Sequence, residues 1–307
     1  MLASMTFFRV PRWLKIALIT LAVLLLVAVL GLYVLIKRAS CASDPVFPAE
    51  VRTAIVDGKR VGWSLSGEAV EGRPTMVLIT GLGNSQMTFA SVLAGLAEHG
   101  QVITYSRLGY CGSDAAPAGP RDAETMAAEL HGLLRETGVP GPYVLVGHSL
   151  GGLIAEYYAA QYPQDVAGLV FDDARASDFQ LRCVATLGAD HCADPWWVRY
   201  VLLLARPQAR EFAALEATET QVRELQVAPR VPALVLSAGI LKRGDGDDFL
   251  KVWHESQYGL AARYGARQLT FDDSAHFLHT EQPARFIELV GGFYDALPPQ
   301  AAAAPTP

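Results

Sequence analysis

The sequence predicts an α/β domain with an open, mostly parallel sheet, helices on both faces and a helical cap insertion, preceded by one N-terminal transmembrane helix. Three observations carry this prediction. Short apolar segments alternate with helical stretches from about residue 50 to residue 296. Several apolar segments are nearly continuous, which is typical of parallel strands covered on both faces. An uncharged run, Ile16–Ile36, lies near the N-terminus.

Composition excludes several other classes of protein. Of the 307 residues 51% are hydrophobic and 18% are charged, which excludes a disordered chain, and four cysteines exclude a disulfide-dense scaffold. Five of the 25 basic residues and none of the 31 acidic residues lie in the first 43 positions, which leaves 20 basic and 31 acidic residues beyond them. A body this acidic repels phosphate backbones, so we expect no nucleic-acid partner.

The first element is the apolar run, which predicts a membrane anchor over residues 1–44 with its flanks. As a helix, residues 16–36 span about 31 Å, the thickness of the bilayer's hydrocarbon core. A cleaved signal peptide is the alternative, because Ser40-Cys41-Ala42 offers a small-residue cleavage site. Basic residues precede the run, and the positive-inside rule then places the rest of the chain in a periplasm or extracellular space. Protection of that part from protease in sealed cells would contradict this orientation.

The second part, residues 45–297, holds the predicted α/β domain. Its strands are predicted at 52–57, 60–66, 75–80, 101–106, 143–148, 167–172, 233–238 and 267–272. Its helices are predicted at 86–98, 121–137, 150–162, 247–264 and 281–296. This alternation favours an open sheet with right-handed crossovers. The Ala/Pro-rich tail, residues 298–307, is predicted to be disordered.

Residues 174–230 interrupt the alternation and predict a mostly helical insertion that caps the site. Its apolar stretch Trp196–Leu204 is equally consistent with a buried structural helix. Cys183 and Cys192 lie nine residues apart in this insertion, and they are expected either as a disulfide in an oxidising compartment or as two free thiols. With His191 they offer only three metal ligands, so we expect no metal site here.

The chemistry-bearing motif is Gly147-His148-Ser149-Leu150-Gly151, which follows a predicted strand and opens a predicted helix. In this context Gly-x-Ser-x-Gly is the nucleophile elbow. The serine lies in a strained turn, and side chains two residues to either side would collide there. The helix start behind it directs backbone N–H groups toward developing negative charge.

With this elbow the sequence resembles the α/β-hydrolase fold superfamily over about residues 50–296. Thr80-Gly81-Leu82-Gly83 resembles the family's His-Gly-x-Gly oxyanion loop, and Arg107–Ser113 resembles its Arg-x-Gly-x-Gly-x-Ser segment. Ala275-His276-Phe277 resembles its Gly-His-Phe, and Glu281-Gln282-Pro283 opens the final helix as the family does. Two residues depart from the pattern, Thr80 for the usual His and Ala275 for the usual Gly, and neither removes a catalytic group.

The resemblance implies a Ser-His-Asp triad in which Ser149 is the nucleophile. A serine hydroxyl is a poor nucleophile at neutral pH and needs a base within hydrogen-bond reach. His276 is expected to be that base, because it follows the last strand at the sheet edge that holds Ser149. The order Ser, acid, His along the chain is also that of the superfamily. His279, one helical turn onward, is the competitor, with a surface or supporting role as its other interpretation.

The triad acid has two candidate places. The usual position after strand 233–238 is Lys242, and the acids nearest to it are Asp245, Asp247 and Asp248, which equally suit a solvated turn and helix cap. The other place is the end of strand 167–172. Asp173 follows Ser149 by 24 residues, a spacing that resembles the haloalkane dehalogenases, and Asp173 is the preferred acid. Successive strand residues face opposite ways, so only one of Asp172 and Asp173 is expected in the site.

The function expected from these residues is a membrane-anchored serine hydrolase that cleaves carboxylic esters through an acyl-enzyme. The backbone N–H groups of Leu82 and Leu150 are expected to form the oxyanion hole. We expect no cofactor and no metal, a lipophilic small-molecule ester as substrate, and membrane contact through residues 16–36. Amidase, peptidase or cofactor-free haloperoxidase chemistry on the same triad is an alternative, as is a catalytically silent member of the fold that serves in binding.

Overall fold

The computed structural model describes residues 11–41, 47, 49–193, 206–225, 230–240 and 246–299, with side chains in the first range up to residue 31. The chain divides into two compact units, Met1–Ser43 and Asp44–Pro307. The first unit contains one long helix, α1 (Arg12–Cys41). Its described segment Arg12–Gly31 is long and apolar enough to cross a membrane or to serve as a signal sequence.

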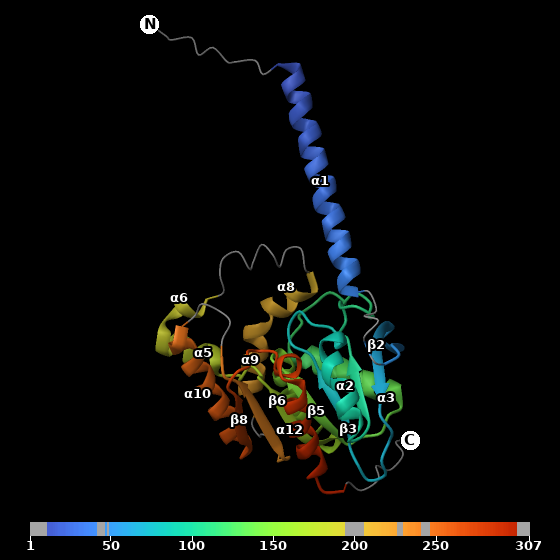
Figure 1. Ribbon diagram of the computed structural model, residues 1–307, viewed down its shortest axis with the longest axis vertical. Helices are drawn as coiled ribbons and strands as arrows, with labels where there is room; N and C mark the ends of the chain where they lie inside the picture. The colour runs from blue at the N-terminus through green and yellow to red at the C-terminus, as the bar shows by residue number, and fades with distance from the viewer. Residues whose placement is uncertain are drawn as a thin grey trace. The chain divides into compact units, whose positions relative to one another are not determined.

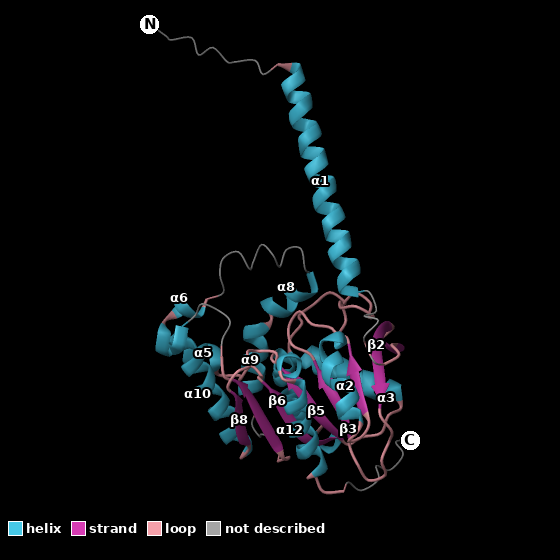
Figure 2. Cartoon of the chain, viewed as in Figure 1, coloured by secondary structure: helices cyan, strands magenta, loops and turns pink. Residues whose placement is uncertain are grey.

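The second unit is built on one sheet of eight strands, which Figure 2 shows in magenta. The order across the sheet is β1-β2-β4-β3-β5-β6-β7-β8. The strands are β1 (Arg52–Val56), β2 (Lys59–Ser66), β3 (Thr75–Ile79), β4 (Val102–Tyr105), β5 (Tyr143–His148), β6 (Val166–Asp172), β7 (Ala233–Ala238) and β8 (Arg267–Phe271). β1 and β2 pair antiparallel, β2 pairs antiparallel with β4, and all later pairs are parallel. The eight predicted strands are confirmed with their ends shifted by at most one residue.

Helices cover both faces of this sheet (Figure 1). One apolar core lies between the sheet and α3 (Ala123–Thr137), α4 (Leu150–Gln161) and part of α10 (Gly246–Tyr264). The other lies between the sheet and α2 (Ala90–Ala97) and α12 (Pro283–Asp295). Alternate residues of β3 and β5 enter the two cores, which explains their unbroken apolar sequences.

Two predicted helices differ from the structure by more than the position of their end residues. The predicted helix 86–98 begins as a 3₁₀ turn, η1 (Gln86–Phe89), before α2. The predicted helix 281–296 is divided into α11 (Leu278–Glu281) and α12. The division falls before Pro283, which lacks the N–H that a continuous helix would need and instead occupies the first turn of α12.

The predicted cap is partly described. Its described helices are α5 (Phe179–Leu187), α6 (Ala189–Cys192), α8 (Arg206–Ala213) and α9 (Leu215–Arg223). Cys183 and Cys192 form a disulfide. The predicted apolar stretch Trp196–Leu204 lies outside the described residues, as do residues 300–307 of the tail 298–307 that is predicted to be disordered.

A buried carboxyl group in α4 gives the fold a pH-dependent stability. Burial raises the pKa of Glu156 to about 7, although Arg263 and the hydrogen bond from Tyr264 oppose the rise. Because the folded pKa lies above the unfolded one, the contribution of Glu156 to stability is fully present below about pH 4.5 and is lost as the pH rises through 7. A shift of this size corresponds to about 3 kcal/mol.

We therefore expect Glu156→Gln to remove this part of the pH dependence. Relative to the parent protein, the variant should gain about 3 kcal/mol in free energy of unfolding between pH 4 and pH 8. Urea unfolding of the full chain in detergent at several pH values measures the gain. Glu136→Gln, at an exposed position of α3, is the control and should leave the pH profile unchanged. Equal profiles for Glu156→Gln and the parent would contradict the assignment.

Candidate active site

The nucleophile elbow forms where the sequence places it. Ser149 connects β5 to α4 with φ 52° and ψ −118°, a strained conformation for a residue with a side chain. A Cβ at Gly147 would lie 2.5 Å from the carbonyl oxygen of Gly151, and one at Gly151 would lie 2.2 Å from that of Ile79. Only glycine fits both positions. Ser149 is half-buried, and its Oγ has no hydrogen-bond partner within the described part of the chain.

The predicted base and the preferred acid are in contact. His276 Nδ1 donates to Asp173 Oδ2 at 2.6 Å. Asp173 is fully buried, and its Oδ1 accepts from the backbone N–H of Ala238 at 2.9 Å and from Trp253 Nε1 at 2.8 Å. The carboxylate is thus held by three donors, and the bond to Nδ1 leaves Nε2 of a neutral His276 free to accept a proton.

The alternative acids lie elsewhere. Asp247 and Asp248 are exposed in the first turn of α10, where acidic residues favour a helix start. Asp245 lies outside the described residues. The geometry therefore favours Asp173 over Asp247 and Asp248 as the partner of His276, and its catalytic role stays a prediction.

Ser149 and His276 are linked through His148. His148 Nε2 donates to the backbone oxygen of His276 at 2.9 Å, and the two rings are 4.7 Å apart. Among the described contacts there is no hydrogen bond between Ser149 Oγ and His276. Such bonds are often long in enzymes without substrate and shorten in the reacting complex, so this pair must close before it can exchange a proton.

A second Asp-His pair lies behind the first. His279 Nδ1 donates to Asp172 Oδ2 at 2.5 Å, and the Thr88 hydroxyl contacts His279 Nε2 at 3.3 Å. His279 is fully buried, so its surface interpretation is wrong, and both of its nitrogens are occupied. Asp172 and Asp173 thus point to different histidines. The rings of His279 and His148 are in edge contact at 4.8 Å, so this pair supports the residue that holds His276.

The charge state of this supporting cluster follows from its burial. Burial lowers the pKa of His148 well below its ordinary value, and the neighbouring His276 and His279 lower it further. Burial likewise raises the pKa of Asp172, against the opposing effect of His279. A neutral His148 that donates from Nε2 has a bare Nδ1, which is buried without a partner among the described residues. The neutral His148 ring therefore holds His276 by donating from Nε2 to its backbone oxygen.

The same cluster contains the ligand atoms that a metal would need. One nitrogen or oxygen each from His148, Asp172 and His279 lie within 4.8 Å of one another. Both nitrogens of His279 and one of His148 are engaged in hydrogen bonds, so a metal would have to displace part of the support of His276. We assign these residues to support.

The predicted oxyanion loop follows β3. Neither the Leu82 N–H nor the Leu150 N–H donates a hydrogen bond within the described residues. The two donors of an oxyanion hole must be free in this way to bind the oxyanion. Thr80, which replaces the family's His, donates to the Asn84 carbonyl at 3.0 Å and accepts from Arg107 at 2.7 Å. Its hydroxyl thus takes over support of the loop.

Sequence reasoning missed the residues that hold the acid and the loop. Trp253, from α10, fixes Asp173, and nothing in its sequence surroundings indicated this. Arg107 was recognised only as part of a family motif. A cavity of about 270 Å³ lies in the cap, lined by residues that include Arg175, Gln180, Phe212 and Glu219; its lining does not include Ser149 or His276, so it does not define the acyl site.

Comparisons with known proteins agree with the fold. A family model described as the alpha/beta hydrolase fold matches residues 74–186. A candidate carbamate hydrolase, RutD, of Escherichia coli O9:H4 is 37% identical over 107 residues, which are 35% of this chain and 40% of that protein. The matched regions span 40% or less of the length of the first curated relatives.

Solved structures share the fold at low sequence identity. The enol-lactonase from Burkholderia xenovorans LB400 is 21% identical, covers 80% of this chain and 100% of its own, and has a TM-score of 0.55. A membrane phospholipase A, a bacterial virulence factor, is 20% identical over 92% of this chain and 98% of its own, with a TM-score of 0.56. The sheet order, the elbow and the family match together show that residues 44–307 have the α/β-hydrolase fold.

Proposed function

We propose that the protein is a membrane-anchored serine hydrolase that cleaves carboxylic esters. The observation that carries this proposal is the hydrogen bond between His276 Nδ1 and Asp173 Oδ2, formed beside a strained serine elbow. It supplies the oriented base without which a serine hydroxyl is inert. The free N–H groups of Leu82 and Leu150 supply the complementary electrostatics.

The reaction follows from these positions. Ser149 Oγ attacks the ester carbonyl carbon while His276 Nε2 takes its proton, and the tetrahedral oxyanion accepts from the two free N–H groups. Collapse breaks the bond to the alcohol oxygen, which leaves with the proton from His276. Water then attacks the acyl-Ser149 ester, again losing a proton to His276, and the second collapse releases the acid and restores the hydroxyl.

The substrate class is inferred from the chemistry and the surroundings. Serine with an oxyanion hole suits acyl transfer, whereas halide displacement in this fold requires a carboxylate at the elbow. The similar proteins are named as a lactonase, a phospholipase and a carbamate hydrolase, and all three names describe enzymes that hydrolyse their substrates. An apolar α1 that anchors the chain in a membrane keeps the hydrolase unit close to lipid, and this favours a substrate with a lipophilic acyl chain.

A panel of p-nitrophenyl esters tests this function. The full chain in detergent should hydrolyse them, with kcat/KM rising from acetate toward longer acyl chains, because apolar contacts gain about 0.8 kcal/mol per buried methylene. Matched p-nitroanilides serve as the comparison and should react more slowly. No hydrolysis of any ester by folded protein would contradict the proposal and favour a binding role.

We further propose that α1 anchors the protein with the hydrolase unit outside the cytoplasm. Disulfides persist in oxidising compartments, and this unit holds the Cys183–Cys192 disulfide. The basic residues before the apolar run favour the same orientation. Digestion of this unit by protease added outside intact spheroplasts agrees with the proposal.

A further inference from the structure

The cap helix α8 lies directly on two loops of the hydrolase core. Gln208 Cγ is 3.5 Å from the point where a side chain at Gly83 would begin, and Pro207 Cβ is 2.9 Å from the same point at Gly109. Gly83 belongs to the oxyanion loop, and Gly109 belongs to the loop after β4. The cap therefore contacts the site through its backbone supports.

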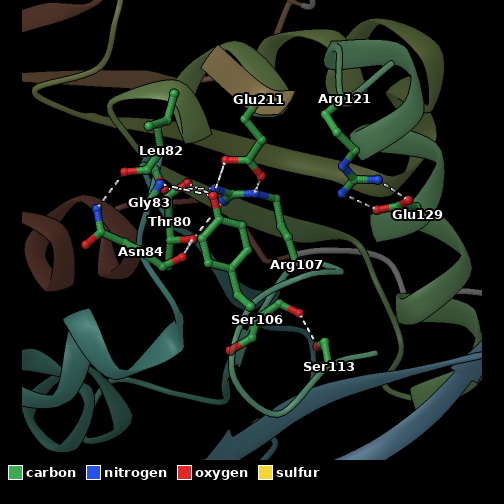
Figure 3. A network of polar contacts seen from close by, with 12 residues as sticks. Thr80, Leu82, Gly83, Asn84, Ser106, Arg107, Ser113, Arg121, Glu129 and Glu211 are labelled. Atoms are coloured by element: carbon green, nitrogen blue, oxygen red, sulfur yellow. Dashed lines mark hydrogen bonds and ion pairs between the residues drawn. The ribbon is translucent and has the colours of Figure 1, made fainter. Parts of the chain in front are cut away.

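A buried ion pair crosses this contact (Figure 3). Arg107, which follows β4, donates from Nε to Glu211 Oε1 at 2.7 Å and from Nη2 to Glu211 Oε2 at 3.0 Å. Both side chains are 1% exposed. Burial by itself lowers the pKa of Arg107, but the Glu211 carboxylate raises it overall, so the guanidinium stays charged. Removing the carboxylate would leave a buried charge without its counterion.

The remaining donors of Arg107 form hydrogen bonds with the oxyanion loop. Nη1 donates to the Thr80 carbonyl at 2.6 Å, and Nη2 donates to the Gly81 carbonyl at 2.8 Å. The Gly81 carbonyl and the Leu82 N–H belong to one trans peptide, so they point in opposite directions. Holding that carbonyl on Arg107 directs the Leu82 N–H away from it and leaves that N–H unpaired.

Tyr110 forms a second connection between Glu211 and the loop. Its hydroxyl donates to Glu211 Oε2 at 2.6 Å and accepts from the Gly83 N–H at 3.2 Å. Burial raises the pKa of Tyr110, and Glu211 raises it further, so the hydroxyl keeps the proton that it donates. Two routes, through Arg107 and through Tyr110, thus join one cap carboxylate to the peptides on both sides of Leu82.

We propose that Glu211 is a positioning residue through which the seated cap helix α8 orients the oxyanion loop. The inference rests on the proposed function, because the loop matters to catalysis only if an oxyanion forms. When α8 is seated, Glu211 fixes the Arg107 guanidinium and the Tyr110 hydroxyl, and these fix the peptides that carry the Leu82 and Gly83 N–H groups. When the carboxylate is removed, the loop loses this alignment.

The experiment uses the full chain in detergent with Glu211→Gln and Tyr110→Phe. Glu211→Gln should lower kcat for a p-nitrophenyl ester by about tenfold to hundredfold, less than or equal to the loss of one oxyanion donor, with KM little changed. The inhibition constant of an arylboronic acid, whose serine adduct places an anionic oxygen in the hole, should rise in parallel. Tyr110→Phe keeps the ion pair and should lower kcat by about threefold to tenfold.

Arg210→Ala is the matched control on the same helix. Arg210 donates to the carbonyls of Ala116, Pro117 and Gly119, outside the oxyanion loop, so its loss should change kcat by less than about threefold. Hydrogen exchange should accelerate over residues 80–84 in Glu211→Gln and Tyr110→Phe but not in Arg210→Ala. If Glu211→Gln does not fold, Tyr110→Phe carries the test.

The outcomes separate the two proposals. Folded variants with parental kcat, boronate inhibition and hydrogen exchange would overturn the role of Glu211 while ester hydrolysis by the parent stands. An equal loss of kcat in Arg210→Ala would also overturn it, because the effect would then come from loosening the helix as a whole. A parent without esterase activity refutes the proposed function alone, and the exchange of residues 80–84 then decides the coupling.

Discussion

Replacing Ser149 by alanine should abolish ester hydrolysis and covalent labelling by a fluorophosphonate. The alanine keeps the backbone of the elbow but removes the atom that forms the acyl-enzyme, so kcat should fall by about 10⁶-fold, as when the nucleophile of a serine protease triad is removed. Residual turnover above the rate in buffer would come from the oxyanion N–H groups and substrate binding alone. Labelling followed by gel fluorescence and steady-state hydrolysis of a p-nitrophenyl ester measure both effects.

Ser66→Ala is the control for this experiment. Ser66 is half-buried at the end of β2, and no hydrogen bond joins it to the elbow among the described residues, so labelling and kcat should remain at the parental level. The thermal unfolding of both variants should match that of the parent. Labelling that persists in Ser149→Ala would contradict the assignment of Ser149 as the nucleophile, because the reactive hydroxyl would then lie elsewhere in the chain.

Much of the fold follows from patterns that act locally. The apolar runs that became β3, β5 and β7 are buried on both faces, and the polar residues Thr75, His148 and Ser237 lie at the strand ends or next to them. The elbow glycines were predictable because steric exclusion at Gly147 and Gly151 is a property of the turn itself. Elements of this kind depend on neighbours within a few residues, which the sequence displays directly.

The acid and the supports of the site depend on contacts that the sequence does not display. Asp173 lies one residue past β6 with φ 42°, a conformation that alternation along a strand does not predict. Its donor Trp253 is 80 residues away, and Arg107 is 104 residues from Glu211. A buried carboxylate and a solvated one look alike in a sequence, so Asp173 and Asp247 became distinguishable only when burial was known.

Asp173→Asn should lower kcat by about 10⁴-fold, because the amide moves the proton of the neutral His276 ring from one nitrogen to the other. Oδ1 of Asp173 accepts from the Ala238 N–H and from Trp253 Nε1, so the amide oxygen must take that position. The amide NH₂ then faces His276 Nδ1, which has to become the acceptor. The proton moves to Nε2, the nitrogen that must receive the proton of Ser149, and the imidazole loses its function as a base.

Asp247→Asn is the matched control and should stay within about twofold of the parent, since Asp247 is exposed at the start of α10 and a helix-terminal charge contributes little to a distant site. Both variants should still bind the ester with similar KM, because neither removes an acyl contact. Pre-steady-state hydrolysis of a p-nitrophenyl ester separates the acylation step, where the loss in Asp173→Asn should appear. If Asp247→Asn were the variant that lost acylation, the hydrogen bond to Asp173 would be structural and the acid would come from the loop after β7.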